Sequence, residues 1–216
     1  MPILTGLAPD PRQPGYRLVE VDRGRFASLP AEALEALLQP LTPGVELSDA
    51  ALARLQDLAD VEAAVRAAVR SLATRGRARG DLRRRLVQKQ HPPRAVDEAL
   101  ARLDARGLLD DRRFAVEYAA RHALRGRGPA RLVADLLSQG VDRAVADRAV
   151  GDALAEEGID PDSALRAVAT RRASQLEKLA PAVRKRRLLA YLARRGYPGA
   201  EARKVVDEVC GAASGT

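Results

Sequence analysis

The sequence lacks most of the side chains that build metal, redox and nucleotide sites. Its 216 residues include one cysteine, Cys210, and two histidines, His91 and His122. A single thiol excludes an internal disulfide, and zinc sites built from several Cys and His residues are excluded in the same way. Neither a G-x-x-x-x-G-K-[ST] phosphate loop nor a G-x-G-x-x-G turn between a strand and a helix occurs. We therefore expect no metal, no cofactor and no nucleotide chemistry.

Long apolar runs and aromatic residues are also scarce. No stretch approaches the roughly 18 uninterrupted apolar residues that cross a membrane, and the first residues lack the basic and apolar regions of a signal peptide. Aromatic residues make up 3% of the chain, against 46% hydrophobic and 31% charged residues. This composition is typical of an ordered, helix-rich protein, which we expect to be soluble and cytoplasmic.

Arginine, in contrast, is abundant and arranged in blocks. The chain carries a net charge of +8, and residues 66–94 alone hold ten basic residues and one acid. Residues 112–131 hold six basic residues and one acid, and residues 171–204 hold eleven and two. Residues 132–170 have a net charge of −5. Arginine blocks attract phosphate and carboxylate groups, although a solvated helix surface is the alternative interpretation of any single block.

The spacing of apolar residues predicts a mainly helical chain. Apolar residues recur every three or four positions from Leu52 to Leu72, which indicates one long helix or two helices broken near Asp60. Eight shorter helices separated by Gly or Pro are predicted over residues 80–90, 93–106, 111–125, 129–139, 142–157, 161–178, 182–195 and 199–210. Before them, residues 16–21 alternate as a strand does, and a turn and a short helix over 30–38 follow.

The helices form an internal repeat. An offset of 50 residues places Leu82, Leu86 and Leu100 on Leu132, Leu136 and Val150, and a further 56 residues leads to Leu188, Leu192 and Val206. The predicted fold class is therefore mainly α, an elongated tandem array of three-helix repeats preceded by a small α+β N-terminal head. The predicted segments are the head at 1–47, the first repeat with its leading helix at 48–110, the second at 111–158 and the third at 159–216. No unbroken heptad seam demands a dimer, so we expect a monomer.

Two stretches of the sequence form a distinctive motif. The central stretch GLLDDRRFAVEY spans 107–118 and is followed by RGRG at 125–128, and the upstream stretch LATRGRARGDL spans 72–82. Together they resemble the RecX family. The resemblance covers about residues 61–210, and the repeat count agrees with it. The motif residues in this chain are Gly107, Asp110, Asp111, Phe114, Tyr118, Gly128 and Gly140. At 78–81 the chain has ARGD, where the family often carries Ser and Glu or an equivalent pair.

The resemblance implies a non-catalytic regulator of the RecA recombinase. Family members are understood to lodge in the groove of the RecA filament on single-stranded DNA and to lower filament extension, ATP hydrolysis, strand exchange and coprotease activity. The partners that we expect are the RecA filament and, weakly and with little sequence preference, single-stranded DNA. The candidate contact residues are Arg77, Arg79, Arg83, Arg84, Arg85, Arg121, Arg125, Arg127, Arg131, Lys185, Arg186, Arg187, Arg194 and Arg195.

Two other function classes are weaker. An autonomous DNA-binding protein would place the third helix of each repeat in a groove, but residues such as Asp97 and Asp147 make those helices too acidic. A metal-dependent nuclease would rest on Asp110 and Asp111 alone, so we expect this pair to serve as a helix cap and a first-turn charge.

The remaining special residues are assigned to packing. We expect Phe114 and Tyr118 to share the buried face of their helix, and Tyr197 and Cys210 to pack in or near the core. His122 is expected on a helix surface. For Tyr191, core packing is favoured over stacking on a nucleic-acid base, because stacking aromatics are so few in this chain.

Overall fold

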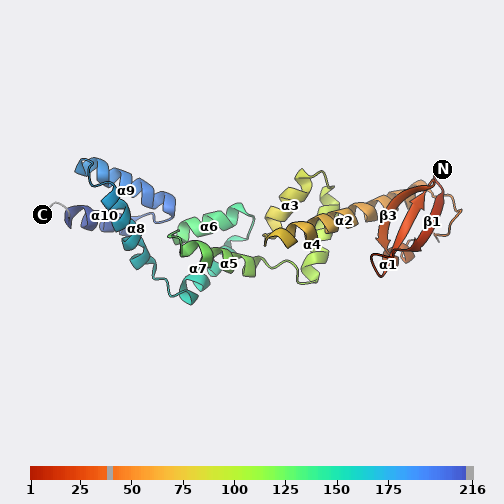
Figure 1. Cartoon of the computed structure of the whole chain (residues 1–216), viewed down its shortest axis with the longest axis horizontal. Coiled ribbons are helices and arrows are strands. Elements are labelled where there is room, and N and C mark those ends of the chain that lie inside the picture. Colours follow the sequence, from red (N-terminus) through yellow and green to blue (C-terminus); the bar gives the residue numbers. More distant parts are fainter. Residues whose placement is uncertain (38–40, 213–216) are drawn as a thin grey trace. The chain divides into compact units, whose positions relative to one another are not determined.

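The computed structural model describes residues 1–37 and 41–212. Within them lie a three-stranded sheet and ten helices, which confirms the mainly helical prediction with a small α+β head (Figure 1). The described residues form two compact units. The first consists of Met1–Gly76 and Leu82–Leu109, and the second consists of Arg77–Asp81 and the chain from Asp110 onward. The four segments predicted from the sequence stay a prediction, and the last of them extends past residue 212.

The head is an antiparallel sheet of β1 (Leu4–Pro9), β2 (Tyr16–Val21) and β3 (Gly24–Pro30), in that order. The strand expected at 16–21 is confirmed. A two-residue turn joins β2 to β3, and both of its residues, Asp22 and Arg23, have positive φ. The short helix α1 (Ala31–Glu35) follows, and position 38 of the predicted helix lies outside the described residues. Strand β1 was not predicted from the sequence.

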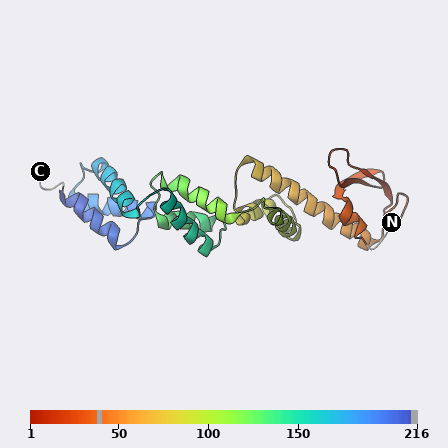
Figure 2. The same cartoon turned by 90° about the horizontal axis from the view of Figure 1, so that it is seen from below.

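The first repeat consists of α2 (Asp49–Thr74), α3 (Arg79–Gln88) and α4 (Pro93–Ala105). Helix α2 begins at Ser48, whose hydroxyl accepts a hydrogen bond from the Ala51 N–H. It runs without interruption, so the alternative of a break near Asp60 is wrong. Figure 2 shows α2 beginning beside the sheet and extending to the region where α4 packs against it. Its early residues pack in the core of the head and its later residues in the core of the repeat, which joins the two within one unit.

A buried carboxylate strengthens this junction. Glu62 of α2 is 2% exposed and accepts hydrogen bonds from the Tyr16 hydroxyl of β2 at 3.1 Å and from Arg102 of α4 at 3.0 Å. Burial, and then the negative charge of Glu62, raise the pKa of Tyr16. Since a buried charge is costly without partners, Glu62 holds the sheet and α4 in one arrangement about α2.

The second unit contains the second and third repeats. The second is α5 (Asp111–Ala123), α6 (Pro129–Ser138) and α7 (Arg143–Glu156), and the third is α8 (Pro161–Gln175), α9 (Pro181–Arg195) and α10 (Ala200–Ala212). Every predicted helix is found within three residues of its predicted ends. The apolar residues equated by the repeat are all buried, with Leu132, Leu136 and Val150 in one core and Leu188, Leu192 and Val206 in another.

Aspartates cap the first helix of each repeat in this unit. Asp110 precedes α5, and its Oδ1 accepts from the Arg113 N–H at 2.8 Å; Asp160 caps α8 through Ser163 in the same way. The expectation of a cap at Asp110 is confirmed. Asp111 lies in the first turn of α5, and its Oδ1 accepts from the backbone N–H of Arg79 at 2.7 Å.

Replacing the cap tests its contribution. We expect Asp110→Ala to lower the free energy of unfolding by about 0.5–2 kcal/mol, because an N–H of the first turn of α5 loses its acceptor. Urea denaturation measures the change, with Asp162→Ala as the control because Asp162 stands in a first turn but is not the capping residue. Equal losses in the two variants would argue against the cap, and a dependence of the Asp110 effect on magnesium would favour a metal site.

Candidate partner-binding surface

The predicted contact residues of the first repeat differ in accessibility. The side chain of Arg77 is 11% exposed and forms an ion pair with Asp81 at 2.9 Å, so it does not fit the expected contact with a partner. Arg79 is half-buried. Arg83, Arg84 and Arg85 are exposed on α3. Arg83 binds Asp97 of α4 at 2.6 Å, and this hydrogen bond, followed by the charge of Asp97, raises the pKa of Arg83.

Two arginines, one in the loop between α5 and α6 and one in the first turns of α6, bind the same carboxylate of their own repeat. Arg127 donates to the Tyr118 hydroxyl at 2.9 Å and to Asp135 of α6 at 2.5 Å, and Arg131 binds the same carboxylate at 2.9 Å. The side chain of Asp135 is 12% exposed. The charges of Arg127 and Arg131 are therefore partly neutralised by a carboxylate of their own repeat. Phe114 and Tyr118 are both half-buried on α5, with ring centroids 6.1 Å apart, as their spacing predicts.

Arg121 and Arg125, at the end of α5, are exposed and form no ion pair with the described residues. In the third repeat, Arg186, Arg187 and Arg194 of α9 are placed in the same way. Lys185 differs, because it pairs with Asp207 of α10 at 2.9 Å, and this contact raises its pKa. The five arginines, unlike Lys185, therefore carry positive charge that no carboxylate in the described part of the chain neutralises.

Tyr191 of α9 lies at the edge of the core of the third repeat. Its ring is half-buried, and two guanidinium groups lie over it, Arg172 of α8 at 5.0 Å and Arg195 at 5.3 Å from the ring centroid. The ring packs against the core of the third repeat, as the sequence predicts, and also carries the two cations. Arg172 was not among the predicted residues, since its contact with Tyr191 joins two helices and leaves no local pattern. Tyr197 and Cys210 are buried, as expected.

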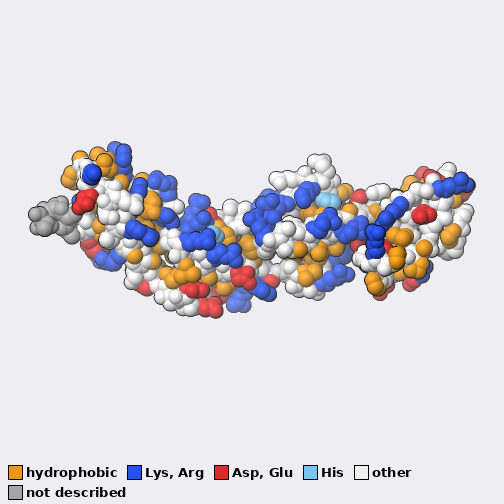
Figure 3. All heavy atoms as spheres, viewed as in Figure 1, with side chains coloured by type: hydrophobic (Ala, Val, Ile, Leu, Met, Phe, Trp, Pro, Cys, Tyr) orange, Lys and Arg blue, Asp and Glu red, His pale blue; other side chains and the backbone are white. Residues whose placement is uncertain are grey.

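The second and third repeats bring four arginines to one place. The guanidinium of Arg195 donates to the Arg125 carbonyl at 3.0 Å, and Arg171 of α8 approaches Gly126 in the same loop. We call Arg125, Arg171, Arg172 and Arg195 the junction cluster. None of the four forms an ion pair with the described residues, so no carboxylate in that part of the chain neutralises them. Figure 3 shows basic side chains gathered over α5 and α6, and acidic ones below them over α7 and α8.

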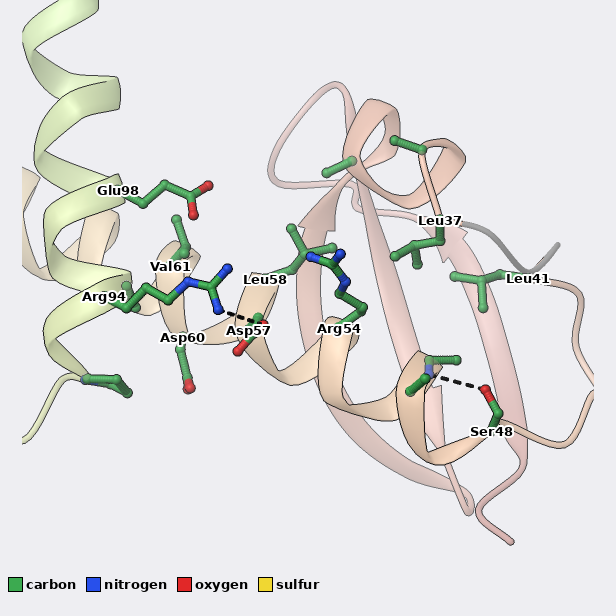
Figure 4. A pocket seen from close by; sticks show the side chains of 16 residues that line it. Leu37, Leu41, Ser48, Arg54, Asp57, Leu58, Asp60, Val61, Arg94 and Glu98 are labelled. Carbon is green, nitrogen blue, oxygen red and sulfur yellow. Dashed lines mark hydrogen bonds and ion pairs between the residues drawn. The ribbon is translucent and has the colours of Figure 1, made fainter.

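The described residues offer neither a metal-type cluster nor a membrane span. No three His, Cys, Asp or Glu side chains come together there as a metal site, and none of the helices described is long and apolar enough to cross a membrane. The first unit has a cleft of about 620 Å³ between the head, α2 and α4 (Figure 4). Leu37, Leu41 and Leu58 line it, and Arg94 and Asp57 lie 4.0 Å apart at its edge. This lining offers shape and apolar contact rather than a reaction centre.

His122 is half-buried against Tyr118, with ring centroids 4.3 Å apart, so its expected place on the helix surface is wrong. Burial, and then the positive charges of Arg127, Arg125 and Arg121, lower the pKa of His122 below its usual 6.5. The unfolded chain therefore takes up a proton at a higher pH than the folded chain does. Stability is complete above the usual pKa and falls as the pH drops through the folded value.

The His122→Gln variant tests this pH dependence. We expect the free energy of unfolding of the parent protein to fall more steeply than that of the variant between about pH 6.5 and pH 5. Urea denaturation at closely spaced pH values measures both curves. Because every other titrating group is shared, the difference between the curves reports His122. Parallel curves over this range would contradict the lowered pKa.

The fold and the surface define a protein of tandem three-helix repeats with exposed basic side chains. Comparison with family models adds three matches, to the first, second and third three-helix domains of RecX, at residues 64–103, 110–150 and 160–206. The chain therefore belongs to the RecX family, as the sequence motifs indicated.

Curated relatives and solved structures agree. The regulatory protein RecX of Amycolatopsis mediterranei (strain U-32) is 33% identical over 138 residues, which cover 63% of this chain and 77% of that protein. That of Mycobacterium marinum is 38% identical over 143 residues, covering 64% and 79%. A crystal structure of regulatory protein RecX has a TM-score of 0.71 at 16% identity and covers 97% of this chain and 98% of its own. RecX from Lactobacillus salivarius has a TM-score of 0.55 at 18% identity, covering 69% and 96%. These two structures support the fold.

Proposed function

We propose that this protein is a non-catalytic, monomeric regulator that binds the RecA recombinase filament on single-stranded DNA. It inhibits filament extension, ATP hydrolysis, strand exchange and coprotease activity. The regulatory role follows from membership of the RecX family, whose curated relatives are named regulatory proteins. The finer role rests on the surface of this chain.

The observation that carries the proposal is the set of arginines that form no ion pair with the described residues. The junction cluster and the exposed Arg121, Arg186, Arg187 and Arg194 come from different helices of the second unit. Guanidinium groups bind both carboxylates and phosphates through paired N–H donors, so this surface suits a partner that presents both. A protein filament formed on DNA is such a partner.

The acidic part of the second unit argues against simple wrapping by nucleic acid. Asp152, Glu156, Glu157 and Asp162 are exposed at the end of α7 and the start of α8. They repel a phosphate backbone and leave only part of the surface suitable for DNA. Contact with a protein that also carries basic side chains satisfies both regions.

The second candidate, autonomous DNA binding by the third helices, has less support. Each third helix carries an exposed aspartate, and in two repeats a basic residue of the middle helix holds it: Arg83 holds Asp97, and Lys185 holds Asp207. In the second repeat Asp147 is exposed on α7 next to Arg143. A helix that reads the major groove needs donors for base edges on that face, and carboxylates beside phosphates oppose its entry.

Inhibition of ATP hydrolysis tests the proposed function. We expect the protein, at less than one copy per recombinase protomer, to lower the ATPase rate of the RecA filament on single-stranded DNA. Replacing both Arg121 and Arg125 with Ala should raise the concentration needed for half inhibition about tenfold, which corresponds to ~1.4 kcal/mol of lost binding. The matched control replaces Arg143 and Arg148, which are equally exposed on α7. An unchanged ATPase rate at a several-fold excess of the parent protein would contradict the proposal.

Binding to naked single-stranded DNA should be electrostatic. If about six phosphates are neutralised, the logarithm of affinity falls against the logarithm of salt concentration with a slope near −4. Replacing Arg83, Arg84 and Arg85 with Ala should reduce that slope by up to about 2 units without creating a sequence preference. Fluorescence anisotropy measures both, with alanine at Arg143, Arg148 and Arg166 removing the same charge from the acidic region as a control. A salt-insensitive affinity or a strong preference for one duplex would support the recognition-helix alternative.

A further inference from the structure

The second and third repeats meet where α9 ends and α6 begins. Gly196 ends α9 with a φ of 93°, and Gly128 is the N-cap of α6. The Gly128 N–H donates to the Arg195 carbonyl at 2.7 Å, so an otherwise unpaired donor at the start of one helix binds an acceptor at the end of the other. The two middle helices are thus hydrogen-bonded end to end.

This contact admits no side chain on either glycine. A Cβ on Gly128 would lie 2.5 Å from the carbonyl oxygen of Gly196 and 2.7 Å from its carbonyl carbon. A Cβ on Gly196 would lie 2.8 Å from the carbonyl oxygen of Gly128 and would overlap the backbone nitrogen of Arg131. The obstructing atoms belong to backbone, which moves only with its helix. Any larger residue must therefore push the two helix ends apart.

A second contact of the same kind lies at the other end of α6. Residues 77–81, which belong to the second unit, approach Gly140 closely enough that a Cβ on Gly80 would lie 2.8 Å from the Gly140 Cα. Gly140 is the repeat equivalent of Gly196, and both have positive φ. Ala78 is the equivalent of Gly128 and is fully buried in the core of the second repeat. The close approach is thus formed twice, with a different residue of the approaching turn in contact each time.

Basic residues flank the contact between α6 and α9. The backbone of Arg131 adjoins Gly196, and the Arg195 side chain crosses to the Arg125 carbonyl. The separation of the two helix ends therefore sets the separation between the arginines of α5 and α6 and those of α8 and α9. A small opening of the contact would shift one set relative to the other.

We propose that the contact of Gly128 with Gly196 is a positioning device that sets the spacing between the basic stretches of the second and third repeats. The spacing lets several stretches bind a periodic partner at the same time. Linked weak sites gain about 10²–10⁴ in overall affinity when their geometry matches the partner, and lose that gain when it does not. The identity of the partner, the RecA filament, rests on the proposed function, whereas the positioning itself does not.

The test pairs each crowded glycine with a glycine that has open space around it. Gly128→Ala introduces the clash without backbone strain, since the φ of Gly128 is −77°. Gly151→Ala in α7 is its control, because nothing lies within 4 Å of the added Cβ. Gly196→Ala is compared with Gly199→Ala, which has a similar φ of 96° and open space around it.

The first measurement is the distance between spin labels on the two repeats. Cysteines replace Arg148 of α7 and Lys204 of α10, both exposed, in a Cys210→Ala background. Gly128→Ala should lengthen or broaden this distance, because the 2.5 Å approach must open toward the 3.4 Å of ordinary contact. Gly151→Ala should leave it unchanged. Identical distributions in the two variants would overturn the proposal.

The second measurement is affinity for the RecA filament, with helix content followed by circular dichroism. Gly128→Ala should bind at least about tenfold more weakly than Gly151→Ala at equal helix content, while affinity for an oligonucleotide of about six nucleotides stays the same. A changed distance with unchanged filament affinity would overturn the positioning role, and so would a loss of helix content in Gly128→Ala that accounts for the weaker binding. If the parent protein itself fails to bind the filament, the proposed function fails, and the label distances still decide whether the glycines set the spacing.

Discussion

The burial of two leucines by each middle helix is the interaction on which every repeat depends. Leu82 and Leu86, and their equivalents in α6 and α9, are 0–1% exposed, and each buried leucine contributes roughly 1.5–3 kcal/mol. The middle helices are only 10–15 residues long, so these leucines are a large share of what holds each one in place. Because one narrow stripe does this work, the remaining faces are free to carry charge. The arginine-rich surface is thus compatible with a stable core.

Part of this charge is neutralised within the repeats. Asp135 binds Arg127 and Arg131, and Asp81 binds Arg77, so parts of the basic blocks stabilise the repeats themselves. The proposed contact surface consists of the arginines for which the described residues supply no carboxylate, either at i+4 or on a neighbouring helix. Charge counted along the chain therefore overstates the binding surface, and the internal ion pairs define which part of it remains.

Much of the fold could be predicted from the sequence because its signals are local. The leucine spacing, the Asp and Pro residues at helix starts, and the glycines at helix ends place the repeat helices within three residues. Strand β1 was missed because LTGLAP contains Gly6 and Pro9, and the strand is held by pairing with β2 and by the Val45 carbonyl. The site residues were harder to predict, because their contacts join different elements and leave no pattern of spacing along the chain. Arg172 of α8 lies over Tyr191 of α9, and Arg127 of the loop after α5 binds Asp135 of α6.

The glycine contacts combine a local sequence signal with a contact between distant parts of the chain. Gly140 and Gly196 are visible in the sequence as helix terminators, and that role alone would accept a glycine with open space around it, as Gly199 has. What the structure adds is backbone packed against both positions, a constraint that helix termination does not require. A protein whose individual basic contacts are weak gains from holding them at a fixed spacing, because each contact then raises the local concentration of the next. Rigid helix ends, rather than any single strong site, give such a surface its selectivity for a repeating partner.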